Sequence, residues 1–350
     1  MWEHPRVSAS LRTGLCDRLG IELPILSAGM GSVAGPELVA AVSNAGGFGV
    51  LGVSGASPDG VRRTIANARA LTDRPIGVNV IIDEEGWATT EEDRALVRAE
   101  VEAAAAENVA AVVVFWGDPT PFVAIAHAHG VALIAQVGSL AEAKAAAGAG
   151  VDAIIVQGVE AGGHVRATES IWELLPAVVE TVAPIPVLAS GGIGDGAGIA
   201  RALRMGAEGV SLGTRFVATD ESRAHPDYKR RIVESAAEDT VYTEDLYDVW
   251  WPGAPHRTLR NKNFDEWEAA ARPSPGNRPG EGTTIGTMRY SSGETYELPR
   301  YGGAGSPLVT FEGDLDLMPM WAGESVEVIH DIQPAGAVVA RLAAEALDYA

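Results

Sequence analysis

The chain has 350 residues, 47% of them hydrophobic and 21% charged, which is the balance of a globular protein with room for a large core. Its 47 acidic residues outnumber its 26 lysines and arginines, and the net charge of -21 disfavours a nucleic-acid binder because such a surface repels phosphate backbones. A single cysteine, Cys16, excludes an internal disulfide and a cysteine-based zinc cluster, and the lack of a long apolar stretch or a signal-peptide core predicts a cytoplasmic protein with no metal and no membrane span.

Short apolar segments rich in valine and isoleucine recur along the chain. They lie at residues 24–28, 48–53, 76–80, 111–115, 131–136, 153–157, 186–190 and 209–212. Segments that are apolar on both faces are typical of buried parallel strands, whereas half-exposed antiparallel strands alternate in polarity. The sequence therefore predicts eight parallel strands.

Helical segments are predicted between these strands and near the end of the chain, at 36–44, 58–71, 90–107, 139–147, 195–205 and 334–346. Ser139, with Glu142 three residues later, forms a capping-box pattern at one of the helix starts. The repeated alternation of strand and helix predicts an α/β protein with the (β/α)8 fold of a TIM barrel, and an open doubly wound sheet is the alternative.

Residues 240–320 interrupt this alternation. They contain Trp250, Trp251 and Trp267, many prolines and glycines, and a turn-rich stretch at 272–282. The paired tryptophans favour packing against the barrel over a disordered linker. We interpret residues 1–350 as a single domain in which 240–320 form a loop-rich, irregular C-terminal excursion over the barrel mouth.

Many of the 41 glycines follow the predicted strands directly, near residues 29–31, 158–163, 191–196 and 213. In a (β/α)8 barrel these turns share the C-terminal face, where active sites are built, and glycine lets a backbone amide approach a ligand closely. The loops after the seventh and eighth strands form the usual phosphate site of such barrels. Tight turns alone would explain one such cluster, but four on one face favour a phosphorylated ligand.

Three polar side chains also lie at the predicted rim. Asn79 lies within the third strand and Gln136 ends the fifth, and two such amides favour a ligand with both donors and acceptors, such as a flavin ring. His164 follows two glycines on a rim loop, where an imidazole could exchange a proton with a ligand near neutral pH. A histidine that only hydrogen-bonds its own loop is the alternative.

The sequence resembles the nitronate monooxygenase family, FMN-dependent barrels formerly called two-nitropropane dioxygenases. The matching stretches are residues 24–52, GVNV at 77–80, AQVGS at 135–139, QGVEAGGH at 157–164, ASGGIGDG at 189–196 and MGAEGVSLGTRFVAT at 205–219. The resemblance is strong over residues 15–234 and looser towards the end of the chain. These motifs are specific for the flavin-barrel group and less so for one reaction within it.

The resemblance implies an FMN site and assigns residues to its parts. Those expected along the flavin ring and ribityl chain are Ala28, Gly29, Met30, Asn79, Gln136, Gly162 and Gly163, and those expected at the phosphate are Ser190, Gly191, Gly192, Gly213 and Thr214. Some relatives carry a lysine where Gln136 stands, which would change the charge beside the flavin pyrimidine. His164 matches the family histidine that lies over the flavin as base or proton donor.

Four further residues are candidates near the site. Trp116, at the end of the fourth strand, either shapes a small substrate pocket or packs against the excursion, and Ser325 matches a serine near the substrate in some relatives. His225 is expected to cap a helix. His256 lies in the excursion, within possible reach of the pocket.

The expected function is FMN-dependent oxidation of a small alkyl nitronate, or a nitroalkane, by O2, with a homodimer as one plausible assembly. The alternative is an FMN-dependent NAD(P)H-using reductase, either a FabK-type enoyl reductase or an NADH:quinone reductase, since these share nearly the same motifs. A nucleotide dehydrogenase with a cysteine nucleophile is disfavoured because Cys16 precedes the first strand. A fourth hypothesis, a non-catalytic flavin- or phosphate-binding protein, is disfavoured because His164 occurs together with the entire binding rim.

Overall fold

The computed structural model describes residues 11–290, 293–302 and 305–349. The first ten residues, in which the sequence shows no signal-peptide core, lie outside this range. Within it, no helix is both long enough and apolar enough to cross a membrane.

Eight parallel strands form a closed barrel, as the apolar segments predict. They are β1 (Ile25–Ser27), β2 (Gly49–Gly52), β3 (Ile76–Ile81), β4 (Ala111–Phe115), β5 (Ala132–Val137), β6 (Ala153–Gln157), β8 (Val187–Ser190) and β9 (Gly209–Leu212). The strand order is β1-β9-β8-β6-β5-β4-β3-β2, and a parallel bridge between Leu26 and Phe48 joins the two end strands. This closure confirms the TIM barrel and rules out the open sheet.

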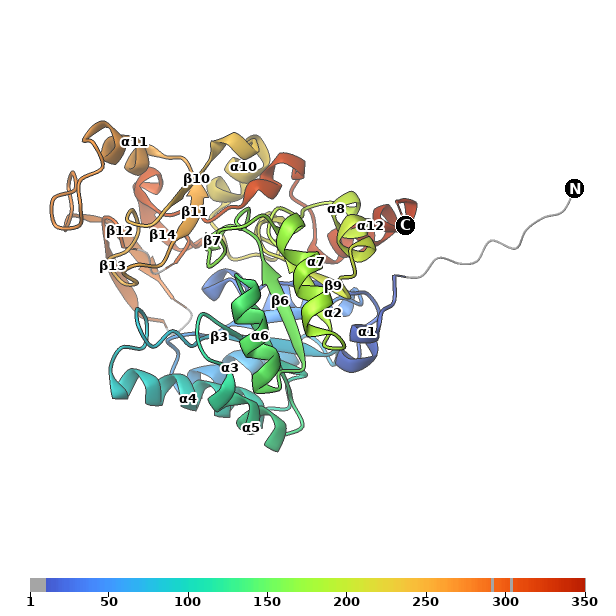
Figure 1. Cartoon of the computed structure of the whole chain (residues 1–350). Helices are drawn as coiled ribbons and strands as arrows, with labels where there is room; N and C mark the ends of the chain where they lie inside the picture. The colour runs from blue at the N-terminus through green and yellow to red at the C-terminus, as the bar shows by residue number, and fades with distance from the viewer. Residues whose placement is uncertain (1–10, 291–292, 303–304, 350) are drawn as a thin grey trace, which may run out of the picture.

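Helices cover the outside of the barrel (Figure 1). They are α2 (Pro36–Asn44), α3 (Pro58–Arg69), α4 (Glu91–Ala106), α5 (Thr120–Ala128), α6 (Leu140–Ala149), α7 (Ile171–Val182), α8 (Gly196–Arg204) and α12 (Ala335–Asp348). The sequence did not predict α5 and α7, and α7 carries Pro176 inside the helix, which weakens its helical pattern. Because only the short α9 (Thr214–Val217) follows β9, α12 returns from the chain end to pack between α8 and α2.

Two apolar layers make up the barrel core. One fills the barrel interior and includes Leu26, Val113, Ile155 and Leu188, and the other lies between the strands and the helices. The short α1 (Gly14–Leu19) contributes buried Cys16 to the interior layer, among residues at the starts of the strands. Cys16 therefore lies at the end of the barrel away from the loops that follow the strands, as its position before the first strand implied.

The region between β9 and α12 lies over the barrel mouth and is coloured from yellow to red in Figure 1. It is more regular than the predicted irregular excursion. Its elements are α10 (Pro226–Glu234), β10 (Thr240–Thr243), β11 (His256–Leu259), α11 (Lys262–Ala269), β12 (Thr284–Arg289), β13 (Thr295–Pro299), β14 (Phe311–Gly313) and the 3-10 turns η2 (Ala237–Asp239), η3 (Leu315–Leu317) and η4 (Glu324–Val328). Two antiparallel sheets form, β13-β12-β14 and β10-β11-β7, and the latter takes in β7 (Gly163–His164) from the barrel rim.

Candidate functional site

A pocket with a cavity volume of about 260 Å3 opens at the carboxyl ends of the barrel strands, beneath the excursion. Every residue expected to bind the cofactor lines it, namely Ala28, Gly29, Met30, Asn79, Gln136, Gly162, Gly163, Ser190, Gly191, Gly192, Gly213 and Thr214. His164 and Ser325 line it as well, whereas Trp116 does not. The fold thus brings together residues from six of the barrel strands and the loops that follow them, because the carboxyl ends of parallel barrel strands share one face.

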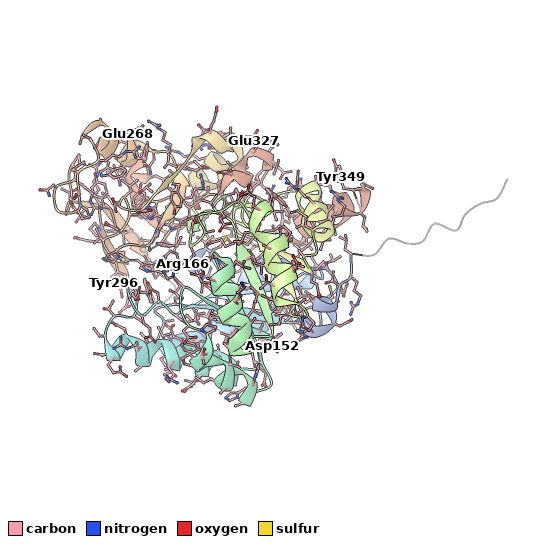
Figure 2. All side chains as sticks on the ribbon, in the orientation of Figure 1. Asp152, Arg166, Glu268, Tyr296, Glu327 and Tyr349 are labelled. Atoms are coloured by element: carbon pink, nitrogen blue, oxygen red, sulfur yellow. The ribbon has the colours of Figure 1, made fainter. Side chains whose placement is uncertain are left out.

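The charge of the pocket differs from that of the molecule. Acidic side chains such as Glu268 and Glu327 lie on the outer surface (Figure 2), where Glu268 pairs with Arg260 and Arg272. Among the described residues that line the pocket, none is an aspartate, glutamate, lysine or arginine. A bound anion would therefore depend on backbone amides and neutral side chains.

Such amides are present at the loops after β8 and β9. Gly191 and Gly192 have φ of +100° and +69°, a conformation that favours glycine, and it leaves their amides unused by the sheet. Among the described residues, no carbonyl accepts a hydrogen bond from the amides of Gly191, Gly192, Gly213 or Thr214. Unpaired N–H groups on two adjoining loops are what a phosphate requires.

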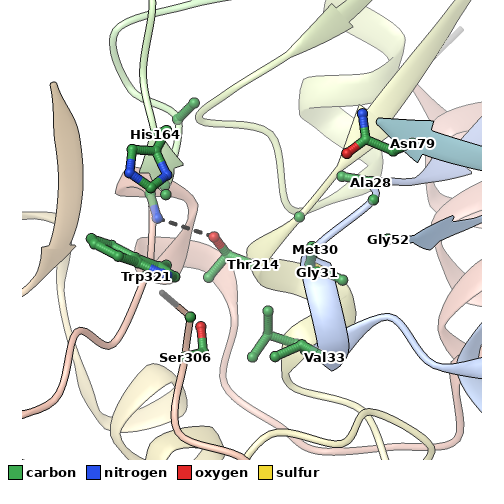
Figure 3. A pocket seen from close by; sticks show the side chains of 18 of the residues that line it. Ala28, Met30, Gly31, Val33, Gly52, Asn79, His164, Thr214, Ser306 and Trp321 are labelled. Atoms are coloured by element: carbon green, nitrogen blue, oxygen red, sulfur yellow. Dashed lines mark hydrogen bonds between the residues drawn. The ribbon is translucent and has the colours of Figure 1, made fainter. Parts of the chain in front are cut away.

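The start of α8 takes no part in this cradle. The Asp195 carboxylate caps the helix by accepting from the amide of Gly198 at 2.8 Å, and the Gly196 amide donates to Glu345. Thr214 is partly used as well, because its Oγ1 accepts from the Gly323 amide at 3.0 Å (Figure 3). The groups of the pocket that could hold an anion are therefore the free amides of the loop after β8 and those at the start of the short α9, and not the start of α8.

The other end of the pocket is formed by the loop after β1 together with β3. Asn79 is buried and its Nδ2 donates to the carbonyl of Val113 at 3.1 Å, which fixes the amide plane. In Figure 3 the Asn79 oxygen points toward Ala28. A Cβ at Gly29 would lie 2.3 Å from the Asn79 Cβ, so only glycine allows this close approach.

His164 lies in a cage of aromatic rings. Its ring centroid is 4.2 Å from that of Trp251, 5.3 Å from Trp321, 6.0 Å from His256 and 6.3 Å from Trp116. The Nε2 atom is buried and has no hydrogen-bond partner among the described residues. Burial lowers the pKa of His164 to about 3, with a smaller contribution from nearby His256, so the imidazole is neutral at physiological pH.

The backbone on both sides of His164 is held by Gln157, at the end of β6. Its Nε2 donates to the His164 carbonyl at 3.0 Å, and its Oε1 accepts from the amide of Arg166 at 2.9 Å. Gln157 also lines the pocket and is 4% exposed. Gln157 was not among the predicted site residues, although it ends the predicted strand 153–157 in the same way that Gln136 ends the predicted strand 131–136.

The other histidine candidates have structural contacts. His225 caps α10, as expected, by accepting from the Asp227 amide at Nδ1. His256 is buried beside His164 on β11, with Nδ1 at 2.9 Å from the Ala254 carbonyl and Nε2 accepting from the Tyr247 amide. These contacts place the proton on Nδ1, and burial lowers the pKa of His256 to about 4.

Trp116 packs against the excursion. Its ring lies 5.0 Å from Trp251, centroid to centroid, and both belong to one buried cluster with Phe115. Ser325 is 5% exposed in η4 and faces the pocket beside the loop after β8.

The excursion supplies pocket residues that the sequence analysis did not identify. They include Trp251, Met288, Tyr290, Ser306 and Leu308, and two more lie outside the excursion, namely Tyr228 on α10 and Trp321 directly after the excursion. No local pattern marks them, because each reaches the pocket only through the way the excursion folds back over the barrel.

Comparisons with known proteins identify the family of this chain. The nitronate monooxygenase family profile matches residues 12–345. A nitronate monooxygenase from Paraburkholderia phytofirmans is 33% identical, with 95% of each chain covered. The (3aS,4S,5R,7aS)-5-hydroxy-7a-methyl-1-oxo-octahydro-1H-indene-4-carboxyl-CoA dehydrogenase of Mycobacterium tuberculosis is 38% identical over 75% of this chain and 70% of its own.

Among solved structures, FabK from Thermotoga maritima superposes with a TM-score of 0.75 and 31% identity, covering 96% of each chain. The similar proteins thus include a monooxygenase, a dehydrogenase and FabK on one barrel. Since the family profile spans nearly the whole chain, this protein is an oxidoreductase that belongs to the nitronate monooxygenase family.

Proposed function

We propose that this protein binds FMN and oxidises small alkyl nitronates, or the parent nitroalkanes, with molecular oxygen. The observation that carries the proposal is the pairing, in one pocket without charged side chains, of a cradle of unpaired amides with a buried histidine nitrogen that has no partner. The cradle suits a phosphate, and the histidine suits a reacting group beside a redox cofactor.

The residues present fit FMN. The amides of Gly191, Gly192, Gly213 and Thr214 would hold its phosphate, and the loop after β1 with Asn79 and Gln136 would border its ring. Gly162 and Gly163 would lie beside the ribityl chain. Bound FMN would supply the electron-transfer chemistry that none of the lining side chains can perform.

His164 is suited to handle a proton at Nε2. The unpartnered Nε2 atom can accept the α-proton of a nitroalkane, and the nitronate anion formed beside it would stabilise the imidazolium against the burial that lowers the pKa of His164. Gln157 would hold the histidine in place through the carbonyl of His164 and the amide of Arg166. A preformed nitronate has already lost this proton and needs His164 only for orientation.

The test is oxygen consumption by the purified yellow protein with ethyl and butyl nitronate. Turnover with at least one of them is expected, and its complete absence would refute the proposal. The His164→Ala variant should keep FMN bound yet turn over the neutral nitroalkane much more slowly, while the exposed His330→Ala serves as its control. Loss of FMN from His164→Ala would instead indicate a structural role.

The second candidate is an NAD(P)H-using reductase, which the similarity to FabK favours. An anaerobic assay separates the two functions, because rapid bleaching of the flavin by NADH or NADPH supports the reductase and bleaching by a nitronate supports the oxidase.

Three further proposals accompany this function. Residues 1–350 act as a single domain with 240–320 as a cover over the pocket. The protein works in the cytoplasm on a small molecule and O2, without nucleic acid or membrane partners. It assembles as a homodimer, which sedimentation would test.

A further inference from the structure

One part of the pocket is not used by the proposed chemistry. We name it the apolar arm and define it by Val33, Val217, Met288 and Leu308, which line the pocket and are 2%, 4%, 1% and 5% exposed. They come from four separate segments, namely η1 (Gly31–Val33), α9, β12 and the stretch before β14, and belong to one apolar cluster. In Figure 3, Val33 lies on the opposite side of Thr214 from His164.

Backbone hydrogen bonds fix the walls of the apolar arm. The Arg223 amide donates to the Val33 carbonyl at 3.2 Å, and the Arg223 carbonyl accepts from the Val309 amide at 2.9 Å. The Leu308 amide donates to the Met288 sulfur at 3.4 Å. These bonds join the barrel loop to the excursion and hold the walls of the arm together.

The apolar arm offers little to a polar group. No charged side chain lines the pocket among the described residues. The hydroxyls beside the arm are those of Tyr228, which donates to the Trp321 carbonyl, and of buried Ser306, which hydrogen-bonds with Tyr228. Burial also raises the pKa of Tyr228, so the phenol remains neutral. A charged group placed here would lose its water without gaining a partner of opposite charge.

The apolar arm is continuous with the part of the pocket assigned to the reaction. Met30 packs against the arm cluster and also against the barrel core, and it stands beside Ala28 and Gly29 at the rim. A ligand with a polar end near His164 and Met30 could therefore extend an apolar tail into the arm.

We infer that the substrate of this site carries an apolar substituent of several carbons that lies in the apolar arm, and that Met288 and Leu308 select it. This inference rests on the proposed function only in placing the reacting end of the substrate near His164. It narrows the substrate class from small nitronates in general to those with an extended hydrocarbon group.

The test uses straight-chain alkanoates, because a carboxylate has the charge and planar oxygen pair of a nitronate but does not react. Isothermal titration calorimetry of the purified holoprotein would compare acetate, butanoate and hexanoate. We expect affinity to rise about fourfold per added methylene, as for burial of one methylene group. A negative heat-capacity change of binding that grows with chain length would accompany it. Equal affinity for the three anions, or no binding of hexanoate, would overturn the inference.

A matched pair of variants locates the effect. Met288→Gln nearly preserves the shape of the side chain and keeps an acceptor for the Leu308 amide, but it places a polar amide in the wall of the arm. Hexanoate should therefore bind roughly tenfold more weakly, while the affinity for acetate should stay the same. Val309→Gln alters the neighbouring, 60% exposed position and should change neither affinity. Should Met288→Gln fail to fold, Leu308→Ala tests the same wall. Loss of the chain-length trend in Val309→Gln as well would overturn the assignment.

The outcomes separate this inference from the proposed function. Chain-length-dependent binding without any turnover of nitronates would support the apolar arm and refute the nitronate reaction. Turnover of nitronates with the same kcat/KM for ethyl and hexyl nitronate would support the nitronate reaction and refute the role of the apolar arm.

Discussion

The neutral state of His164 depends on the aromatic cage, and Trp251 is the nearest ring to it at 4.2 Å. Since burial is the largest cause of the low pKa of His164, removing the indole with Trp251→Ala should admit water and raise that pKa from about 3. The ordinary value of about 6.5 sets the upper limit, and removal of one of several surrounding rings should raise the pKa by at least about one unit.

The difference is large enough to measure directly. At pH 5 a pKa near 3 leaves about 1% of the imidazole protonated, whereas a pKa of 6.5 would leave about 97% protonated. Nitrogen NMR of histidine-labelled protein reads the protonation of each ring, and His164→Gln assigns the signal. The matched control is Trp250→Ala, since Trp250 is adjacent in sequence but 39% exposed.

Two results would refute the reasoning. One is a wild-type His164 signal that titrates between pH 6 and 7. The other is a change in the His164 pKa that is equally large in Trp250→Ala and Trp251→Ala. A stability measurement gives an independent check. Because the native pKa lies below the unfolded one, the unfolded chain takes up a proton that the native protein does not. Above pH 6.5 the imidazole is neutral in both states, so His164 does not lower the free energy of unfolding there. As the pH drops from 6.5 toward 3, the free energy of unfolding should fall.

Three further predictions concern other parts of the molecule. Gly191→Val should weaken FMN binding at least tenfold, as measured by flavin fluorescence. Valine strongly disfavours a φ of +100°, and its Cβ would lie 3.1 Å from the Ala161 amide nitrogen. Unchanged affinity would contradict the assignment of Gly191 to the phosphate. Gln157→Met should lower kcat about tenfold while KM changes less, because both hydrogen bonds that hold the backbone around His164 are lost. An activity loss explained entirely by a lower Tm would argue against a role of Gln157 in positioning His164. Burial raises the pKa of Glu100 to about 8 and outweighs the backbone amides of Gly55 and Ala56, which lower it, so the wild-type protein should lose stability as pH rises from 4.5 to 8. Glu100→Gln should remove this dependence and exceed the wild-type Tm at pH 8 by about 5 °C, equivalent to about 4 kcal/mol for this chain length, whereas an equal Tm difference at pH 5 would contradict it.

The barrel was predictable from sequence because its strands are buried on both faces. Interior residues such as Val113 and shell residues such as Val112 alternate along one strand, so both positions are apolar and the strand appears as a continuous run. The excursion lacks such runs. β13, for example, is exposed at three of its five positions, and β7 is only two residues long and forms by pairing His164 with His256. Strands of this kind depend on distant partners, which local sequence does not reveal.

Some residues of the site could likewise be placed from sequence and others could not. Residues that follow barrel strands could be placed at one rim, because parallel strands end at the same edge, and the twelve expected cofactor residues surround one pocket. The environment of His164 could not be placed. Its cage includes Trp251 and Trp321, which are separated from it by 87 and 157 positions in the numbering and meet it only through tertiary packing.

The barrel and the excursion contribute different parts of the site. The cradle of amides and the loop after β1 belong to the barrel, and they suit the same cofactor whatever substrate is used. The groups that set the protonation of His164 and the shape of the apolar arm come largely from the excursion, among them Trp251 and Met288. Replacing excursion residues should therefore change substrate preference and pH dependence while leaving flavin affinity nearly unchanged, and replacing rim glycines should have the opposite effect. Related barrels with similar rim motifs would then differ in reaction chiefly through this segment.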